Sequence, residues 1–145
     1  MPYKNIEINQ IDTVYQQASK TNHFYKGFSS INNPDVGNRL FDLDLIKQDI
    51  INQFNTRKGE RVMNAQFGSI IWDLLMEPLT EATTEALKDD IQAIVSSDPR
   101  VTPSQIKLTE YDNGYLLELT LTLVNTDQST NLKLSFDQKL GLVVQ

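Results

Sequence analysis

Residues 80–97 have the clearest hydrophobic pattern in the chain, because apolar residues recur there at helical spacing on one face. That face consists of Leu87, Ile91, Ile94 and Val95. Thr80 is suited to cap the helix, since its side-chain oxygen can accept a hydrogen bond from an unpaired backbone amide. Pro99 has no N–H and pushes Asp98 out of helical geometry. The pattern therefore predicts an amphipathic helix that begins after Thr80 and ends near Ser97.

A second helical pattern covers residues 43–54. Its apolar face consists of Leu43, Ile46, Ile50, Ile51 and Phe54. A short, very apolar piece follows at residues 70–76, before Pro78, and has to be buried as a helical turn or as irregular core packing. We interpret its Trp72 as a core residue.

After Arg100 the period changes, and apolar and polar residues alternate over three segments. The alternating apolar positions are Ile106, Leu108, Tyr115, Leu117, Leu119, Leu121, Leu132, Leu134 and Phe136. Asp112-Asn113-Gly114 predicts a hairpin between the first two strands, because Asn and Gly tolerate positive φ. Residues 125–130 form a longer polar loop, and residues 140–144 either extend the sheet or form an apolar tail.

The order of these elements predicts an α+β domain at residues 41–145, with two main helices packed on a small three-stranded antiparallel meander. Residues 1–40 are polar and rich in amides, without a sustained period, and predict an extended N-terminal arm. The aromatic residues of the arm either anchor it on the domain or on a neighbouring subunit, or the arm is a loosely ordered tail.

Composition narrows the possible functions of this 145-residue chain. A net charge of −6 argues against wide contact with nucleic acid, and the absence of cysteine excludes disulfides and thiolate chemistry. No apolar run approaches the roughly 20 residues that cross a bilayer, and we expect no signal peptide, no membrane contact and no cofactor. His23 is the only histidine, which gives little support to a histidine-based metal site or catalytic triad.

A row of carboxylates spaced by four leaves an enzymatic alternative open. The row consists of Asp73, Glu77, Glu81 and Glu85, and paired carboxylates are what a glycosidase needs. Pro78 and Thr80 interrupt any continuous helix through the row, so a solvated acidic surface, or one that meets a basic partner, is the favoured interpretation. A stand-alone adaptor that binds peptides at the edge of its sheet is a further alternative.

Several short motifs follow one another in a distinctive order. They are Thr56-Arg57-Lys58-Gly59-Glu60-Arg61, Phe67-Gly68, Pro78-Leu79-Thr80 and Asp98-Pro99-Arg100-Val101. Taken alone, the first motif, with its three cationic side chains, is either a solvated loop or a partner contact. With their order and spacing, the motifs over about residues 40–136 resemble the baseplate wedge and sheath-initiator family of contractile-tailed phages and related injection systems. The stretch at 25–31 is also similar to the aromatic arm of that family.

The resemblance implies a noncatalytic virion protein of the inner baseplate, made in the host cytoplasm and present in six copies. Its expected partners are the core helical bundle of the baseplate wedge proteins, the tail sheath protein and the hub or tube proteins. The family's small sheet accepts a strand from the sheath protein and templates the first sheath ring. The residues expected to contact partners are Asp98, Pro99, Arg100, Arg57, Lys58, Gly59, Phe67 and Gly68.

The sequence departs from the family at one position, because Asp98 stands where the signature tripeptide has Glu. Asp keeps the charge but is one methylene shorter, so any arginine partner has to lie closer. Pro99 fixes the backbone, and Arg100 can then make forked contacts with a carboxylate or with exposed helix-end carbonyls of a partner bundle. The alternative is that Arg100 pairs within its own chain.

Overall fold

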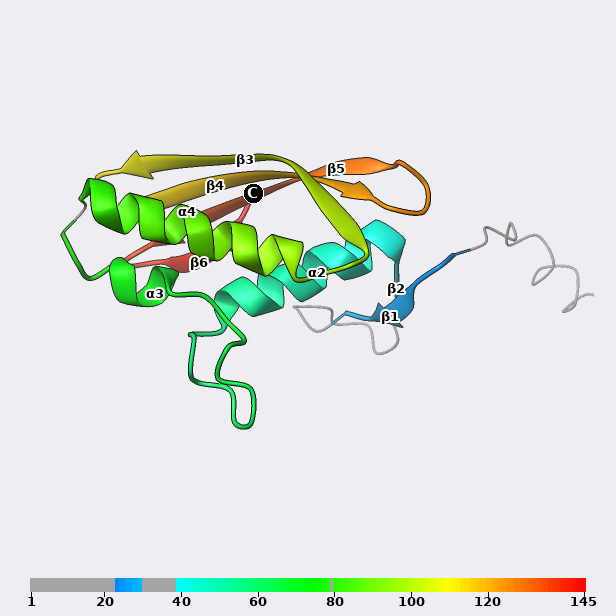
Figure 1. The fold of residues 1–145 in the computed structure, drawn as a ribbon, viewed down its shortest axis with the longest axis horizontal. Helices are drawn as coiled ribbons and strands as arrows, with labels where there is room; N and C mark the ends of the chain where they lie inside the picture. Colours follow the sequence, from blue (N-terminus) through cyan, green and yellow to red (C-terminus); the bar gives the residue numbers. More distant parts are fainter. Residues whose placement is uncertain (1–22, 30–38, 79) are drawn as a thin grey trace, which may run out of the picture.

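The computed structural model describes residues 23–29, 39–78 and 80–145 of the chain. Its main body is a four-stranded antiparallel sheet in the order β3-β4-β5-β6, with the helices on one face (Figure 1). The helices are α2 (Asp42–Asn55), α3 (Ile71–Leu74) and α4 (Glu81–Ser96). The strands of the sheet are β3 (Val101–Tyr111), β4 (Gly114–Leu123), β5 (Ser129–Asp137) and β6 (Gly141–Val144). A separate two-stranded ribbon is formed by β1 (Lys26–Phe28) and β2 (Arg39–Phe41).

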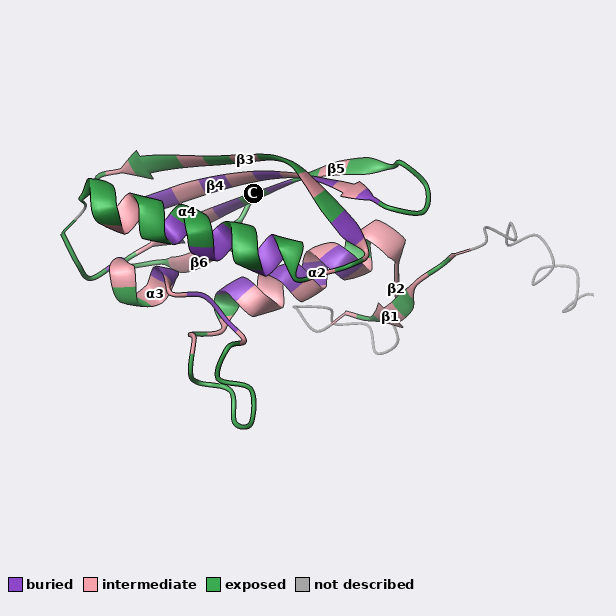
Figure 2. Cartoon of the chain, viewed as in Figure 1, coloured by how far each residue is buried: buried purple, intermediate pink, exposed green. Residues whose placement is uncertain are grey.

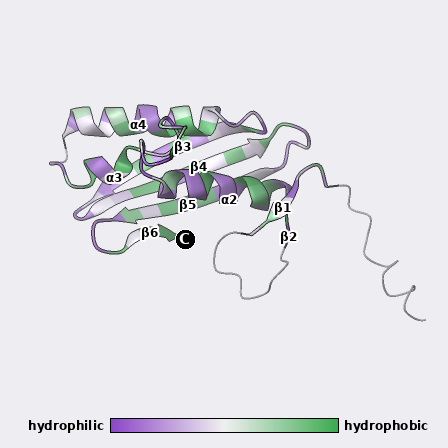
Figure 3. Ribbon diagram, turned by 90° about the horizontal axis from the view of Figure 1, so that it is seen from below, coloured by the Kyte–Doolittle hydropathy of each residue, from purple (hydrophilic) through white to green (hydrophobic). Residues whose placement is uncertain are grey.

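The two predicted main helices are confirmed, with bounds within one or two residues of the pattern. Thr80 caps α4 through a capping box, in which its hydroxyl accepts from the Thr83 amide and the Thr83 hydroxyl accepts from the Thr80 amide. Both helices alternate between hydrophobic and hydrophilic segments along their length (Figure 3). The apolar piece at 70–76 contains the short helix α3. None of the described helices is long and apolar enough to cross a membrane.

The core lies between the helices and the inner face of the sheet (Figure 2). Directly opposed residues of antiparallel strands share a face, and the register places Leu108, Leu117 and Leu134 side by side on the inner face. The indole N–H of Trp72 donates to the carbonyl oxygen of Phe54 at 2.7 Å, while its ring packs partly buried against this core. The interpretation of Trp72 as a core residue is therefore confirmed.

The prediction of a three-stranded meander was wrong by one strand. Residues 141–144 pair with β5 as the edge strand β6, with Leu142 opposite Phe136. The sequence left residues 140–144 open between a further strand and an apolar tail, because an edge strand of four residues shows little alternation. The first strand also extends further than its alternating positions, because a register shift between Pro103 and Gln105 interrupts the alternation at its start.

The hairpin between β3 and β4 forms where it was predicted, but the reason given for it was wrong. Neither Asn113 nor Gly114 adopts a positive φ. Gly114 is needed because its backbone approaches β5 closely: a Cβ atom there would lie 1.8 Å from the carbonyl oxygen of Phe136. Glycine at this position therefore serves packing between strands rather than the turn itself.

Part of the predicted arm forms the ribbon of β1 and β2, which the sequence pattern did not indicate. Asp42 holds the two together, because its Oδ1 accepts from the amides of Phe24 and Tyr25, both at 2.9 Å. Its Oδ2 lies 3.0 Å from Nδ1 of His23, whose ring stacks on Phe41. The ribbon thereby joins the start of α2. The rest of the predicted arm, at 1–22 and 30–38, lies outside the described residues.

Candidate functional site

A surface groove of about 1020 Å³ runs between α2, the loop that joins α2 to α3, and the corner that joins α4 to β3. Its walls are rich in amide and charged side chains. The lining residues are Asp49, Ile50, Asn52, Gln53, Thr56, Glu60, Arg61, Asn64, Gln66, Phe67, Ser97, Asp98, Pro99 and Arg100. The groove thus brings together three of the four sequence motifs, the last of which begins 30 residues after Gly68.

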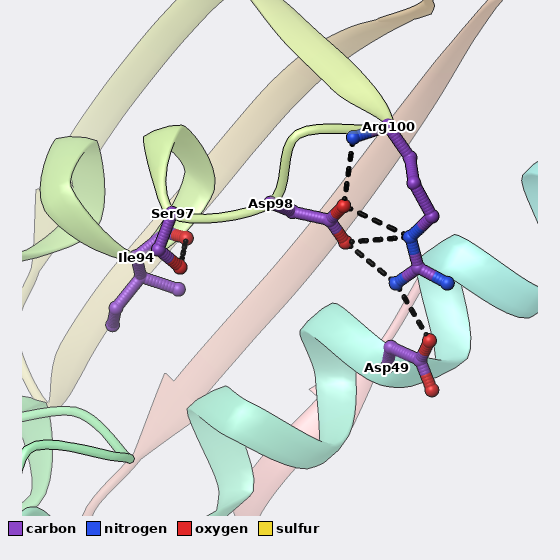
Figure 4. A network of polar contacts seen from close by, with 5 residues as sticks. All are labelled: Asp49, Ile94, Ser97, Asp98 and Arg100. Carbon is purple, nitrogen blue, oxygen red and sulfur yellow. Dashed lines mark hydrogen bonds and ion pairs between the residues drawn. The ribbon is translucent and has the colours of Figure 1, made fainter.

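The corner is a tight turn that Asp98 and Arg100 hold closed (Figure 4). The Arg100 amide donates to Oδ1 of Asp98 at 3.0 Å, which is an Asx-turn across Pro99. The guanidinium forks onto the same carboxylate, with Nε 2.9 Å from Oδ1 and Nη2 2.6 Å from Oδ2. The sequence predicts that an arginine partner of Asp98 lies close, because Asp is shorter than Glu. Arg100 is such a partner, within hydrogen-bonding distance of the Asp98 carboxylate.

A third residue joins the corner to α2, because Nη2 of Arg100 also donates to Oδ2 of Asp49 at 2.8 Å. The pairing of Arg100 within its own chain, which the sequence left as an alternative, is thus present. It does not use the whole guanidinium: Nη1 makes no hydrogen bond to any residue that the structure describes, and Figure 4 shows it pointing away from the Asp98 carboxylate. Arg100 is fixed in direction and still has two N–H donors to offer.

The charges at the corner stabilise one another. Burial disfavours the charged form of Asp98, but the hydrogen bonds and charge of Arg100 outweigh it and hold the pKa of that carboxyl below its usual value. The hydrogen bonds from Arg100 to Asp98 and Asp49 raise the pKa of the guanidinium despite its partial burial. Each charge of the pair therefore favours the ionised form of the other.

The ribbon also reaches this corner. The ring of Tyr25 lies under the guanidinium of Arg100, 5.7 Å from its central carbon, at a distance suited to a cation–π contact. The hydroxyl of Tyr25 accepts from the side-chain amide of Asn125 at 3.0 Å, in the loop between β4 and β5. Tyr25 therefore joins three segments that are far apart in the sequence.

The loop between α2 and α3 is anchored on α4 by one buried carboxylate, that of Asp90. It accepts from Nζ of Lys58 at 3.0 Å, from Oγ of Ser69 at 2.9 Å and from the amide of Ile70 at 3.0 Å. A buried carboxylate needs such partners, because an unpaired charge in the interior is strongly disfavoured. Lys58 thus forms an ion pair with Asp90 within this chain.

The other predicted contact residues lie in or next to the same loop. Phe67 lines the groove, with the guanidinium carbon of Arg61 stacked 4.4 Å from its ring centre. Arg57 is exposed outside the groove lining, with Nε 3.5 Å from a carboxylate oxygen of Asp73. Gly59 and Gly68 both adopt positive φ, which gives them a conformational role in the loop.

The carboxylates spaced by four are spread over two helices and the turn between them. Asp73 lies on α3, Glu77 in the turn after it, and Glu81 and Glu85 at the start of α4. All four are exposed, and none of them lines the groove. The interruption by Pro78 and Thr80 is confirmed, because α3 ends at Leu74 and α4 begins at Glu81.

Two residues of the site were missed from the sequence, namely Asp49 and Asp90, while Tyr25 was expected only as one of the aromatic residues that could anchor the arm on the domain. A signal existed for Asp90: it lies three residues after Leu87 and four before Ile94, on the apolar face of α4. A carboxylate on such a face indicates a buried partner. No local signal pointed to Asp49, because its partner Arg100 is 51 residues away in the chain.

The described residues form a small α+β domain with a polar groove and an interlocked corner. The comparisons with known proteins identify its family. The model of the family "Baseplate wedge protein gp25" matches residues 42–128, and the chain belongs to this family. It is therefore a structural component of the baseplate of contractile tails.

Two known proteins are similar to this chain, one in sequence and one in fold. The chain is 28% identical over 106 residues to baseplate wedge protein gp25 of Enterobacteria phage T4, which covers 70% of this chain and 80% of that protein. A crystal structure from Geobacter sulfurreducens, of a protein provisionally named a tail lysozyme, superposes with a TM-score of 0.52 at 20% identity. It covers 65% of this chain and 92% of that one, and the likeness is one of fold.

Proposed function

We propose that this chain joins the helical bundle of the baseplate wedge proteins to the first ring of the tail sheath, in six copies per baseplate. The groove and the corner Asp98-Pro99-Arg100 hold the wedge bundle, while the sheet accepts a strand of the sheath protein. The hub and tube proteins lie next to this junction. Membership of the wedge family supports the assignment to the baseplate, and the geometry of Arg100 supports the contact with the wedge bundle.

Arg100 has the properties of an arginine that binds a partner. Two carboxylates hold it in one orientation, so little conformational entropy is left to lose on binding. The unused Nη1 can donate to a carboxylate or to the last carbonyls of a partner helix, and its side chain is 25% exposed at the groove. The amide side chains of the groove, such as Gln53 and Asn64, can both donate and accept along a polar partner surface.

Arg100→Ala is expected to leave the isolated chain folded and to weaken its binding to the purified wedge proteins by about 30-fold or more. Truncating one member of a hydrogen-bonded charge pair in an interface costs about 2–5 kcal/mol. Binding is measured by titration calorimetry, and folding by a thermal melt. Arg39→Ala is the matched control, because Arg39 is exposed outside the groove lining. Wild-type affinity of Arg100→Ala would refute the role of the corner.

The sheath contact is proposed for the edge strand β6. The opposite edge, β3, is blunted by Pro103 and by the register shift that follows it, both of which hinder pairing with another strand. On β6, the Gln145 amide donates to the Lys133 carbonyl of β5 at 3.0 Å. Alternate residues of an antiparallel edge strand bond to the neighbouring strand, so the N–H and C=O of the preceding residue, Val144, point away from β5. An incoming strand would pair with these groups and lie beside the exposed side chains of Val143 and Val144.

Val144→Pro is expected to reduce sheath initiation on assembled baseplates about ten-fold, without weakening wedge binding. The substitution removes an outward N–H that the β5–β6 ladder does not use. Electron microscopy of baseplates mixed with sheath protein counts those that carry a first ring. Val144→Thr keeps the N–H and the branched shape, so it should initiate as the wild type does. Equal initiation by the proline variant would exclude β6 as the acceptor.

A further inference from the structure

The loop between α2 and α3 has an exposed apolar tip, formed by Val62 and Met63. Val62 is 86% exposed and Met63 is fully exposed, so neither packs against any part of the chain that the structure describes. Figures 1 and 2 show the far part of this loop standing away from the helices and the sheet and coloured as exposed. Single exposed apolar residues are common on proteins, but two adjacent ones at the end of a projecting loop need a further explanation.

Met63 is also held in a conformation that its side chain disfavours. Its φ is +66°, in the left-handed region that glycine and asparagine adopt readily and that a long side chain avoids. Such strain persists where the surrounding structure or a function compensates for it. The side chain of Met63 makes no compensating contact within the described residues, so there only the backbone hydrogen bonds of the loop hold this conformation, and the apolar side chain is left for another contact.

The loop is nevertheless braced from its base to its tip. The Gly59 amide donates to the Ala65 carbonyl at 2.9 Å, and the Asn64 amide donates to the Arg61 carbonyl at 3.2 Å. The stacking of Arg61 on Phe67 and the buried carboxylate of Asp90 hold its two sides. A braced loop presents its tip in one place, which lowers the entropy lost when a partner binds.

The tip continues the wall of the groove. Arg61 and Asn64, the residues that flank Val62 and Met63, both line the groove, so a protein seated in it would reach the tip. We propose that Val62 and Met63 form an apolar plug that enters a hydrophobic pocket between helices of the wedge partner. The unbranched side chain of methionine adapts to such irregular pockets. The proposal rests on the function proposed above, because it assigns a second contact to the same groove.

The test compares Met63→Asn, Val62→Ser and the wild type for binding to the purified wedge proteins, by titration calorimetry. Removing an apolar side chain that fills a pocket should weaken binding about ten-fold in either variant. Met63→Asn should not lower the unfolding midpoint of the isolated chain, because asparagine tolerates the left-handed conformation. Met76→Asn is the matched control, since Met76 is 74% exposed outside the groove lining, and its binding should be unchanged.

The outcomes separate this inference from the function on which it rests. Weaker binding of both tip variants, with unaltered stability and an unaffected Met76→Asn, supports the plug. Tip variants that bind like the wild type overturn the plug, while a loss caused by Arg100→Ala in the same assay keeps the proposed function. Equal loss in Met76→Asn overturns the assignment to the tip, and a wild-type chain that does not bind the wedge proteins overturns both proposals.

Discussion

Asp90→Asn is expected to lower the free energy of unfolding by about 3 kcal/mol, because it breaks a buried network in which a carboxylate accepts three hydrogen bonds. Asparagine has about the same shape, but it loses the charge that pairs with Lys58. In either orientation of the amide, its NH2 group would also replace an acceptor with a donor, which would face Lys58 or the donors of Ser69 and Ile70. Urea unfolding followed by circular dichroism measures the loss as a lower midpoint at unchanged slope.

The neighbouring Asp89 provides the control for this prediction. It lies on the same helix with an exposed side chain, so Asp89→Asn removes the same charge without disturbing the network. Its effect should stay within about 0.5 kcal/mol. If the two variants unfolded at the same urea concentration, the network around Asp90 would contribute nothing beyond its charge, and the anchoring of the loop on α4 would have to come from elsewhere.

Elements with a long periodic pattern were predicted correctly, because their apolar faces are defined by residues close together in the sequence. α4 is such a case: its apolar face, its cap at Thr80 and its end before Pro99 are all local signals. The ribbon was missed and β6 was left as one of two alternatives, because short strands depend on contacts elsewhere in the chain. In the ribbon, Asp42 supplies them across 17 and 18 residues of sequence.

The parts of the candidate site that consist of adjacent residues were predicted from the sequence, and the contacts between distant residues were not. The turn formed by Asp98, Pro99 and Arg100 follows from three adjacent residues, and its closeness to Phe67 in one groove follows only from the packed fold. The role of Lys58 shows the limit of composition, because an isolated cationic run does not reveal that one of its members is paired with a carboxylate 32 residues away. Whether the predicted residues contact partners stays a prediction that the binding assays address.

Gly68→Ala is expected to destabilise the chain by about 3 kcal/mol or more, for two reasons that add. Its φ is +112°, and a non-glycine residue with positive φ costs about 1–2 kcal/mol. A Cβ atom at this position would also lie 2.6 Å from the carbonyl oxygen of Thr56 and 2.9 Å from that of Arg57. These are backbone atoms, and the Thr56 carbonyl accepts from the Ser69 amide at 2.9 Å, so relieving the clash would break a hydrogen bond at the base of the loop.

Gly59 distinguishes the cost of positive φ from the cost of the clash. Its φ is +88°, but a Cβ atom at this position would have no described atom beyond the neighbouring residues within 4 Å. Gly59→Ala should therefore cost only the conformational part, about 1–2 kcal/mol. Thermal or urea unfolding of both variants measures the difference. A larger loss in Gly68→Ala would indicate that this glycine allows two backbone segments to approach each other beside Asp90. Equal losses would mean that the loop can shift to admit a side chain, and that its base is less tightly packed than the contacts of Ser69 indicate.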